Sequence, residues 1–87
     1  AILSGVDLRG ANMAGASLVR VNLQGANLEK ANLREVDLRE ADLSGANLQG
    51  ALLTDVNLFQ ANLAGVDLSN SNLKGVDLQR ANPQQAN

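Results

Sequence analysis

The sequence contains no cysteine, histidine, tryptophan or tyrosine, and its one aromatic residue is Phe59. The absence of cysteine excludes disulfides and thiolate metal sites. The absence of histidine removes the commonest general base and the commonest metal ligand. Because 45% of the residues are still hydrophobic, the core must be aliphatic. No nucleophile stands beside a suitable base, so we expect a protein that is not an enzyme and holds no metal or cofactor.

An excess of charge of one sign is also missing. Seven basic and nine acidic residues leave a net charge of −2, which attracts neither nucleic acid nor anionic lipid. No apolar run is long enough to span a membrane, and no signal peptide is visible. We therefore expect no nucleic-acid or membrane partner, and a soluble chain for which the cytoplasm is the favoured compartment. The chain starts in phase with its own repeat, which indicates a segment of a longer protein.

A five-residue repeat runs from end to end without an insertion. Position 1 is Ala or Val in seventeen of eighteen repeats, position 2 is Asn or Asp in fifteen of eighteen, and position 3 is Leu in fifteen of seventeen. Position 4 varies, and position 5 holds all eight glycines. The exceptions at position 2 are Ile2, Ser17 and Leu52. Unbroken periodicity of this kind predicts one repeat domain over residues 1–87.

The five-residue length of the repeat excludes both a regular α-helix and a straight β-strand. A helix turns about 100° per residue, so leucines five residues apart would be scattered around every side. In a straight strand an odd repeat would turn the next Ala and Leu to the opposite face. The chain must therefore turn at every repeat, with Gly at position 5 and Asn or Asp at position 2 as turn residues. The pattern predicts an all-β solenoid with an aliphatic interior.

The glycines indicate how many repeats make one coil, because residues one coil apart share an environment. At a spacing of 20 residues, four successive residues at one corner are glycine: Gly5, Gly25, Gly45 and Gly65. Another corner has no glycine: Arg20, Glu40, Gln60 and Arg80. At a spacing of 15, every corner is mixed. A corner that requires a positive φ would separate the residues in this way, so the pattern favours a four-sided coil.

Several repeats carry a family resemblance, among them 26–30 (Ala-Asn-Leu-Glu-Lys), 41–45 (Ala-Asp-Leu-Ser-Gly) and 61–65 (Ala-Asn-Leu-Ala-Gly). They resemble the pentapeptide repeat family, whose consensus is A-[DN]-L-x-x, over essentially the whole chain. The resemblance implies a right-handed quadrilateral β-helix with four pentapeptide repeats per coil. The 87 residues would then form a little over four coils.

Such a coil predicts four inner ladders of side chains from position 3. They are Leu3, Leu23, Leu43, Leu63 and Pro83; Leu8, Leu28, Leu48 and Leu68; Met13, Leu33, Leu53 and Leu73; and Leu18, Leu38, Leu58 and Leu78. The ends of a solenoid expose unpaired edges and normally need caps, yet no amphipathic helix is visible at either end. Pro83 lacks an N–H, so it should stop strand addition locally.

Four residues are candidates for a protein contact. Phe59 occupies an outward position 4 in the same column as Arg39, and Leu52 stands where Asn or Asp is expected. Arg39 and Glu40 belong to the most densely charged segment, 34–42. An exposed aromatic residue can anchor an interface. The alternative is ordinary surface: a single exposed apolar residue, and alternating charges in solvent.

These observations favour a non-catalytic structural or protein–protein interaction module with an unidentified protein partner and with end-to-end self-association. The resemblance implies an alternative, because some family members imitate duplex DNA and protect a type II topoisomerase. Those members have a continuous acidic surface, a dimer formed through C-terminal residues and commonly Phe at the centre of the repeat. This chain departs from them in its balanced charge, its short polar tail and its central Leu.

Overall fold

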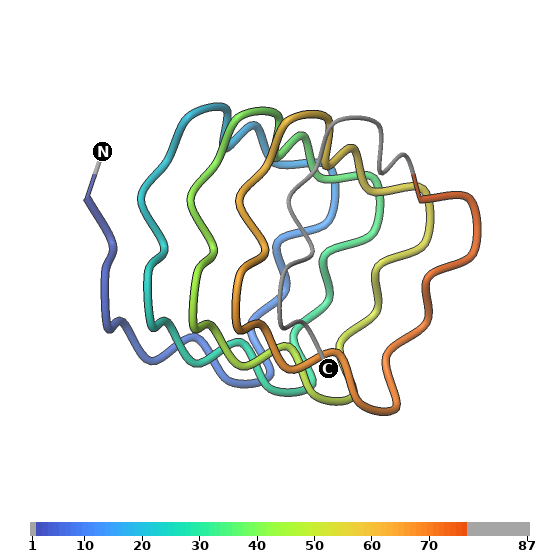
Figure 1. Ribbon diagram of the computed structural model, residues 1–87. Coiled ribbons are helices and arrows are strands. Elements are labelled where there is room, and N and C mark those ends of the chain that lie inside the picture. Colours follow the sequence, from blue (N-terminus) through green and yellow to red (C-terminus); the bar gives the residue numbers. More distant parts are fainter. Residues whose placement is uncertain (1, 77–87) are drawn as a thin grey trace.

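In the computed structural model, which describes residues 2–76, the chain winds into coils of twenty residues stacked along one axis (Figure 1). Each coil has four sides, and each side is one repeat. We number the sides in chain order, so the sides one to four of the second coil are residues 21–25, 26–30, 31–35 and 36–40.

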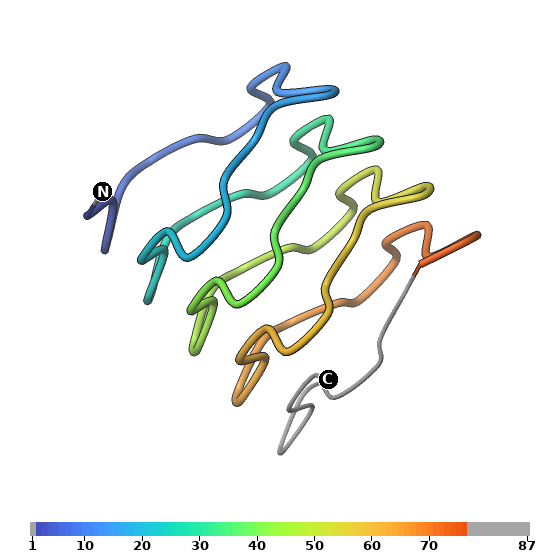
Figure 2. The same cartoon turned by 90° about the horizontal axis from the view of Figure 1, so that it is seen from above.

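Adjacent coils are joined by parallel bridges between residues twenty apart, from Ile2 paired with Asn22 to Leu52 paired with Asn72 (Figure 2). Each side contributes a single bridge residue at position 2, and no helix forms within residues 2–76. The 20-residue step confirms the predicted right-handed quadrilateral β-helix with four repeats per coil.

Backbone hydrogen bonds between coils follow one rule. Positions 3 and 5 donate to the next coil: the Leu23 N–H to the carbonyl of Asp42 at 2.8 Å, and the Gly25 N–H to that of Ser44 at 2.9 Å. Position 2 donates to the preceding coil, as the Asp42 N–H does to the Val21 carbonyl at 2.9 Å. The stack thereby satisfies main-chain groups that would be costly to bury unpaired.

Every corner is the same turn. The N–H at position 1 donates to the position 3 carbonyl of the preceding repeat, as Ala46 does to Leu43 at 2.9 Å. The residue at position 5 has a positive φ in every described repeat. A bond between residues i and i+3 with a positive φ only at i+2 defines a type II turn.

The four-sided coil is confirmed, but the expectation that a positive φ sets the glycine corner apart from the others is wrong. The corner without glycine has the same backbone: φ is 61° at Arg20 and 59° at Glu40, against 68° at Gly25 and 69° at Gly45. Positive φ is thus required at all four corners. Seven non-glycine residues accept it, at a cost of about 1–2 kcal/mol each relative to a right-handed conformation.

Position 4 has the remaining backbone N–H, and a side chain satisfies it. Wherever position 2 is Asn or Asp within residues 2–76, its Oδ1 atom accepts a hydrogen bond from the N–H two residues later. In the third coil, Asp42 accepts from Ser44 at 3.0 Å and Asn47 from Gln49 at 2.9 Å. Asn or Asp is needed at position 2 because its side-chain oxygen supplies this acceptor. A general preference of these residues for turns does not by itself account for the acceptor role.

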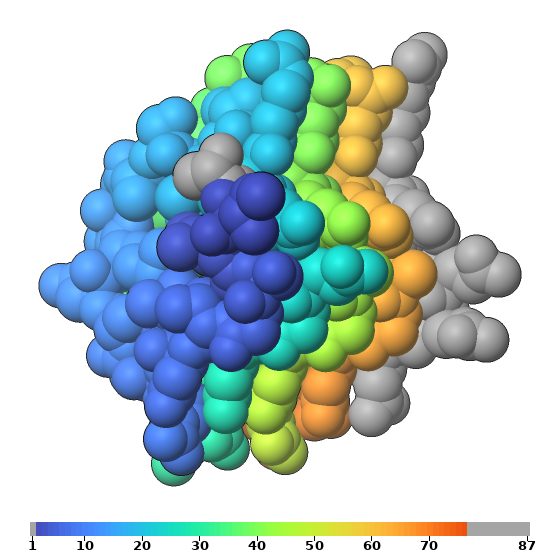
Figure 3. All heavy atoms as spheres, turned by 90° about the vertical axis from the view of Figure 1, so that its left-hand side faces the viewer, coloured from blue at the N-terminus to red at the C-terminus, as the bar shows by residue number. Residues whose placement is uncertain are grey.

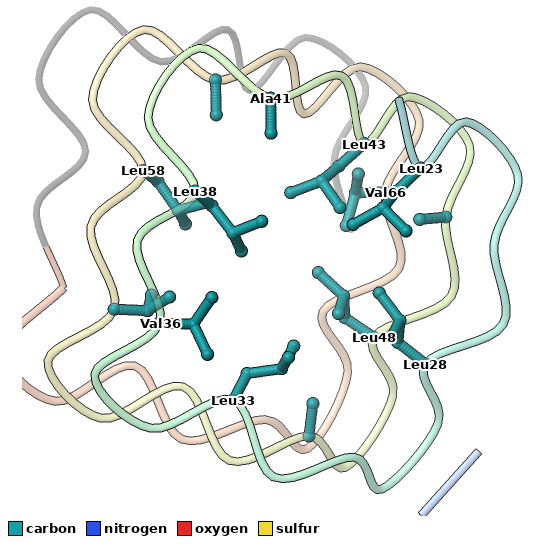
Figure 4. Packing of buried hydrophobic residues seen from close by; sticks show 14 of the residues in the cluster. Leu23, Leu28, Leu33, Val36, Leu38, Ala41, Leu43, Leu48, Leu58 and Val66 are labelled. Atoms are coloured by element: carbon teal, nitrogen blue, oxygen red, sulfur yellow. The ribbon is translucent and has the colours of Figure 1, made fainter. Parts of the chain in front are cut away.

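The buried core of the described residues consists of Ala, Val and Leu side chains from the four sides, and Figure 4 shows Leu33, Val36, Leu38, Leu43 and Leu48 converging on it. The buried core extends from Val21 to Val66, and no polar side chain is buried among residues 2–76. Each fully buried leucine contributes roughly 1.5–3 kcal/mol. The predicted ladders are confirmed within the described residues; Leu78 and Pro83 lie outside them.

The ends of the stack are less buried than its middle. Leu3, Leu8, Met13 and Leu18 in the first coil are only partly buried, and Leu73 in the fourth is 38% exposed. The molecule measures 27 × 25 × 24 Å, so the stack is a block about as long as it is wide.

Candidate functional site

Within residues 2–76, the outer surface of the stack is where a candidate site can lie. This part of the chain contains no pocket and no group of three or more acidic side chains that could hold a metal ion. No helix of the described chain is long and apolar enough to cross a membrane. The candidate site therefore consists of side chains at the outward positions 2, 4 and 5 of the repeats.

Three of the four predicted contact residues lie together on side four. Arg39 and Phe59 occupy position 4 in adjacent coils, and the Glu40 N–H donates to the Phe59 carbonyl at 2.9 Å. Val19 precedes them in the same column, and like Phe59 it is half-buried. We call Val19, Arg39, Glu40 and Phe59 the side-four patch. It combines two apolar side chains with an exposed guanidinium and an exposed carboxylate.

The charges of the side-four patch are paired with their neighbours. An Arg39 Nη atom lies 2.7 Å from an Asp37 carboxylate oxygen, in an ion pair within one repeat. The hydrogen bonds donated by the Arg39 side chain hold the pKa of Asp37 below its ordinary value. Arg20 Nε lies 3.6 Å from Glu40 Oε1, between consecutive coils. The patch therefore presents an oriented guanidinium but little net charge.

Leu52, the fourth predicted contact residue, lies on side three and is 36% exposed. A leucine cannot accept a hydrogen bond, and the structure gives the Thr54 N–H no hydrogen-bond acceptor among the described residues. The structure thus separates Leu52 from the other three candidates. Leu52 costs its repeat a hydrogen bond and also exposes apolar surface.

Arg9 shows the limit of arguments from column register. In the four-sided register Arg9 stands one coil from Glu29. The pKa of Arg9 is raised chiefly by a side-chain hydrogen bond to Asp7, and the carboxylate of Glu29 contributes. The ion pair of Arg9 is with Asp7 of its own repeat, at 2.8 Å. This contact lowers the pKa of Asp7, chiefly through the side-chain hydrogen bond. Arg20, by contrast, pairs with Glu40 of the next coil, at 3.6 Å.

Sequence reasoning did not select Val19 as a contact residue. The signal was present, since Val19 is an apolar residue at the outward position 4 of the column that contains Phe59. The acceptor role of position 2 was also missed, although Asn and Asp bond their own backbone two residues on in Asx turns.

The fold defines the class of this protein: a solenoid in which each coil consists of four pentapeptide repeats. The family model described as pentapeptide repeats matches the chain in eight copies, over residues 1–39, 16–55 and 51–87. The chain therefore belongs to the pentapeptide repeat family. No curated protein sequence gives a significant match.

Solved structures of pentapeptide repeat proteins are similar to the chain. One from Nostoc PCC 7120 has 36% identity and a TM-score of 0.85, over 86% of this chain and 62% of that protein. One from the Arabidopsis thaliana thylakoid lumen has 36% identity and a TM-score of 0.59, over 91% of this chain and 66% of that protein. HetL, involved in heterocyst differentiation regulation in Nostoc, has 32% identity and a TM-score of 0.53, over 98% of this chain and 46% of that protein. The chain thus spans less than two thirds of each.

Proposed function

We propose that the chain is a non-catalytic protein–protein interaction module, part of a longer protein, and that it binds a protein partner through the side-four patch. The observation that carries the proposal is the column in which Arg39 and Phe59 stand in adjacent, hydrogen-bonded coils. Aromatic residues and arginine are enriched at interfaces and dominate their binding energy.

Two properties of the patch support this role. The Asp37 carboxylate holds the Arg39 guanidinium in one orientation, so less side-chain entropy is lost on binding. Phe59 is half-buried, so its ring is partly supported by the stack and partly free to contact a partner. Leu52 is a second proposed contact, on side three, where a partner would cover the apolar side chain.

Quantitative affinity capture from the source cell, with the purified chain as bait, tests the proposal. Phe59→Ala and Arg39→Ala should each lower recovery of the same partner at least tenfold, as for central interface residues. Gln24→Ala, at the exposed position 4 of side one, is the matched control and should leave recovery unchanged. Equal recovery with all three variants would contradict docking on side four.

Imitation of duplex DNA is the alternative for this family, and the charge arrangement does not favour it. A mimic needs rows of acidic groups, whereas Asp7, Asp37 and Glu40 each have an arginine partner within 4 Å. Paired charges cancel the long-range field that mimicry requires. In a supercoiling assay with a type II topoisomerase, we expect no inhibition at micromolar concentration. Inhibition that disappears at high salt would reverse this conclusion.

The proposal also includes a cytoplasmic location and association between copies of the chain. Cell fractionation with an antibody against the chain tests the compartment. Recovery in the membrane pellet or in a lumenal fraction would contradict the cytoplasmic location.

A further inference from the structure

The backbone N–H of Thr54, at position 4 of side three in the third coil, has no acceptor among residues 2–76. In other repeats the side chain at position 2 supplies the acceptor: the Arg34 N–H, one coil earlier, donates to Asn32 Oδ1 at 3.2 Å. Leu52 occupies position 2 of the Thr54 repeat and cannot accept a hydrogen bond. A main-chain N–H normally has an acceptor in a folded protein, so the Thr54 N–H is a donor available to a ligand.

Two cationic residues stand on either side of Thr54 in its column. Arg34 occupies position 4 one coil earlier and Lys74 one coil later, and both residues are exposed. Neither forms an ion pair among residues 2–76. Successive coils follow one another as adjacent bands on the outside of the stack (Figure 3), at a spacing of about 4.8 Å. Both long side chains can therefore reach one group placed over Thr54.

The Arg34 guanidinium is oriented by its own repeat. Its Nε–H donates to Asn32 Oδ1 at 3.2 Å, while its two Nη groups donate to no acceptor within residues 2–76. A guanidinium with both Nη groups available can bind a phosphate through two parallel hydrogen bonds, and a lysine ammonium adds a point charge. The hydroxyl of Thr54 is a further donor beside its N–H. The column thus contains hydrogen-bond donors from three consecutive coils.

Two carboxylates at the adjoining corner lower the net charge of side three. Glu35 and Asp55 occupy position 5, and within the described residues neither is ion-paired with the two cations. A Cβ atom at Gly75 would overlap Asp55 Oδ1, so this carboxylate extends along the corner toward the next coil. Because the acids reduce the attraction of side three for anions, we expect a free anion to bind in the millimolar range.

We propose that Thr54, Arg34 and Lys74 form a binding site for a phosphate group on side three. The Thr54 N–H and hydroxyl donate at the centre and the two cations donate from the flanking coils, which matches the several oxygens of a tetrahedral anion. Leu52 leaves the central N–H without an internal acceptor, and its side chain, 36% exposed, offers an apolar contact to the group that carries the phosphate. A phosphorylated residue with an apolar neighbour uses both features, whereas inorganic phosphate uses only the first.

Titration of isotope-labelled chain with inorganic phosphate, followed through backbone amide chemical shifts, tests the inference. The Thr54 amide should shift most, and the shift should saturate. Leu52→Asn supplies an internal acceptor and should weaken binding about tenfold, the loss expected for one hydrogen bond to a charged group. Arg34→Gln removes the bidentate cation and should weaken binding by about the same factor.

Asn47→Leu is the matched control, because it removes the acceptor of the Gln49 N–H on side two. The neighbours of Gln49 at position 4 are Glu29 and Ser69, so this variant has the same unpaired N–H without flanking cations. Its Gln49 amide should not respond to phosphate. A Gln49 response equal to that of Thr54, or shifts spread evenly over all four sides, would overturn the inference.

Two further ligands identify the chemistry and its source. Acetate at the same ionic strength should leave the Thr54 amide unshifted, and an equal response to acetate would overturn the assignment to phosphate. A phosphoserine peptide with leucine beside the phosphoserine should bind more tightly than inorganic phosphate, and its unphosphorylated form should not bind. Equal binding of phosphopeptide and inorganic phosphate would identify the free anion as the ligand. Phe59→Ala should bind phosphate as wild type does, so failure here is separable from failure of docking on side four.

Discussion

The Oδ1 atom of Asn47 accepts a hydrogen bond of 2.9 Å from the backbone N–H of Gln49. This bond supplies an acceptor to the one N–H of the repeat that neither the turn nor the neighbouring coils satisfy. The bond makes position 2 a structural requirement of each repeat, and it also makes Leu52 a testable exception.

Replacement of Leu52 by Asn should stabilise the protein. The new side chain can accept from the Thr54 N–H, and a typical hydrogen bond contributes about 0.5–1.5 kcal/mol. Asn47→Ala should destabilise by a similar amount, because it removes the acceptor for Gln49. Urea unfolding of both variants measures the two effects. A Leu52→Asn variant that is less stable than wild type would show that the bond contributes little.

Removal of a ladder leucine should cost more in the middle of the stack than at its end. Leu43 is 0% exposed and lies between two coils, so Leu43→Ala should lower the free energy of unfolding by roughly 2–5 kcal/mol. Leu3, in the same ladder, is only partly buried, so Leu3→Ala should cost much less. Denaturant midpoints compare the two variants, and equal losses would rule out a cooperative stack.

At the corners, introducing a glycine should raise the stability of the protein, and replacing a glycine should lower it. Gln60 has a φ of 59°, so Gln60→Gly should relieve strain and stabilise by up to about 1 kcal/mol. Gly45 has a φ of 69°, and an added Cβ would meet nothing within 4 Å. Gly45→Ala should therefore destabilise by about 1 kcal/mol through backbone strain alone. Thermal unfolding checks both, and two neutral substitutions would refute the strain argument.

Stability should fall in acid through a small set of aspartates. Hydrogen bonds from Arg39 lower the pKa of Asp37, and those from Ser69 lower the pKa of Asp67. A lowered folded-state pKa gives stability that is present above the unfolded pKa of about 4 and is lost as the pH falls through the folded value. Urea midpoints between pH 6 and pH 2 measure the loss.

Asp37→Asn is the control for the acid effect, because an amide oxygen can still accept from the Arg39 N–H but does not titrate in this range. The variant should lose less stability than wild type between pH 4 and pH 2. An identical acid profile for the two proteins would exclude Asp37 as a contributor.

The fold could be predicted from the five-residue phase because the period itself excludes a helix and a straight strand. The corner conformation could not be predicted in the same way. Glycine at Gly25 suggested a positive φ, but Glu40 has one as well, because the repeated turn imposes it whatever the side chain. The backbone geometry that all corners share therefore determines φ at position 5, and the conformational preference of the residue at a single corner does not.

The candidate site was predictable only in part. Column register placed Arg39 beside Phe59, since both are position 4 residues of side four. Glu40 follows Arg39 in the same repeat and was therefore expected beside both. Register did not predict which acid Arg9 would contact, because Asp7 and Glu29 are both within reach of a long side chain. The closer, bidentate contact within the repeat prevails, with Arg9 Nε 2.9 Å from Asp7 Oδ1.

The most direct test of docking through side four is site-specific photo-crosslinking in the cell that makes the protein. A photoreactive phenylalanine at position 59 should form an adduct with one protein, and the same group at position 24, on side one, should form none. Adduct at position 59 that Arg39→Ala abolishes is the result we predict. Equal adducts from both positions, or none from position 59, would contradict the assignment of side four as the docking surface.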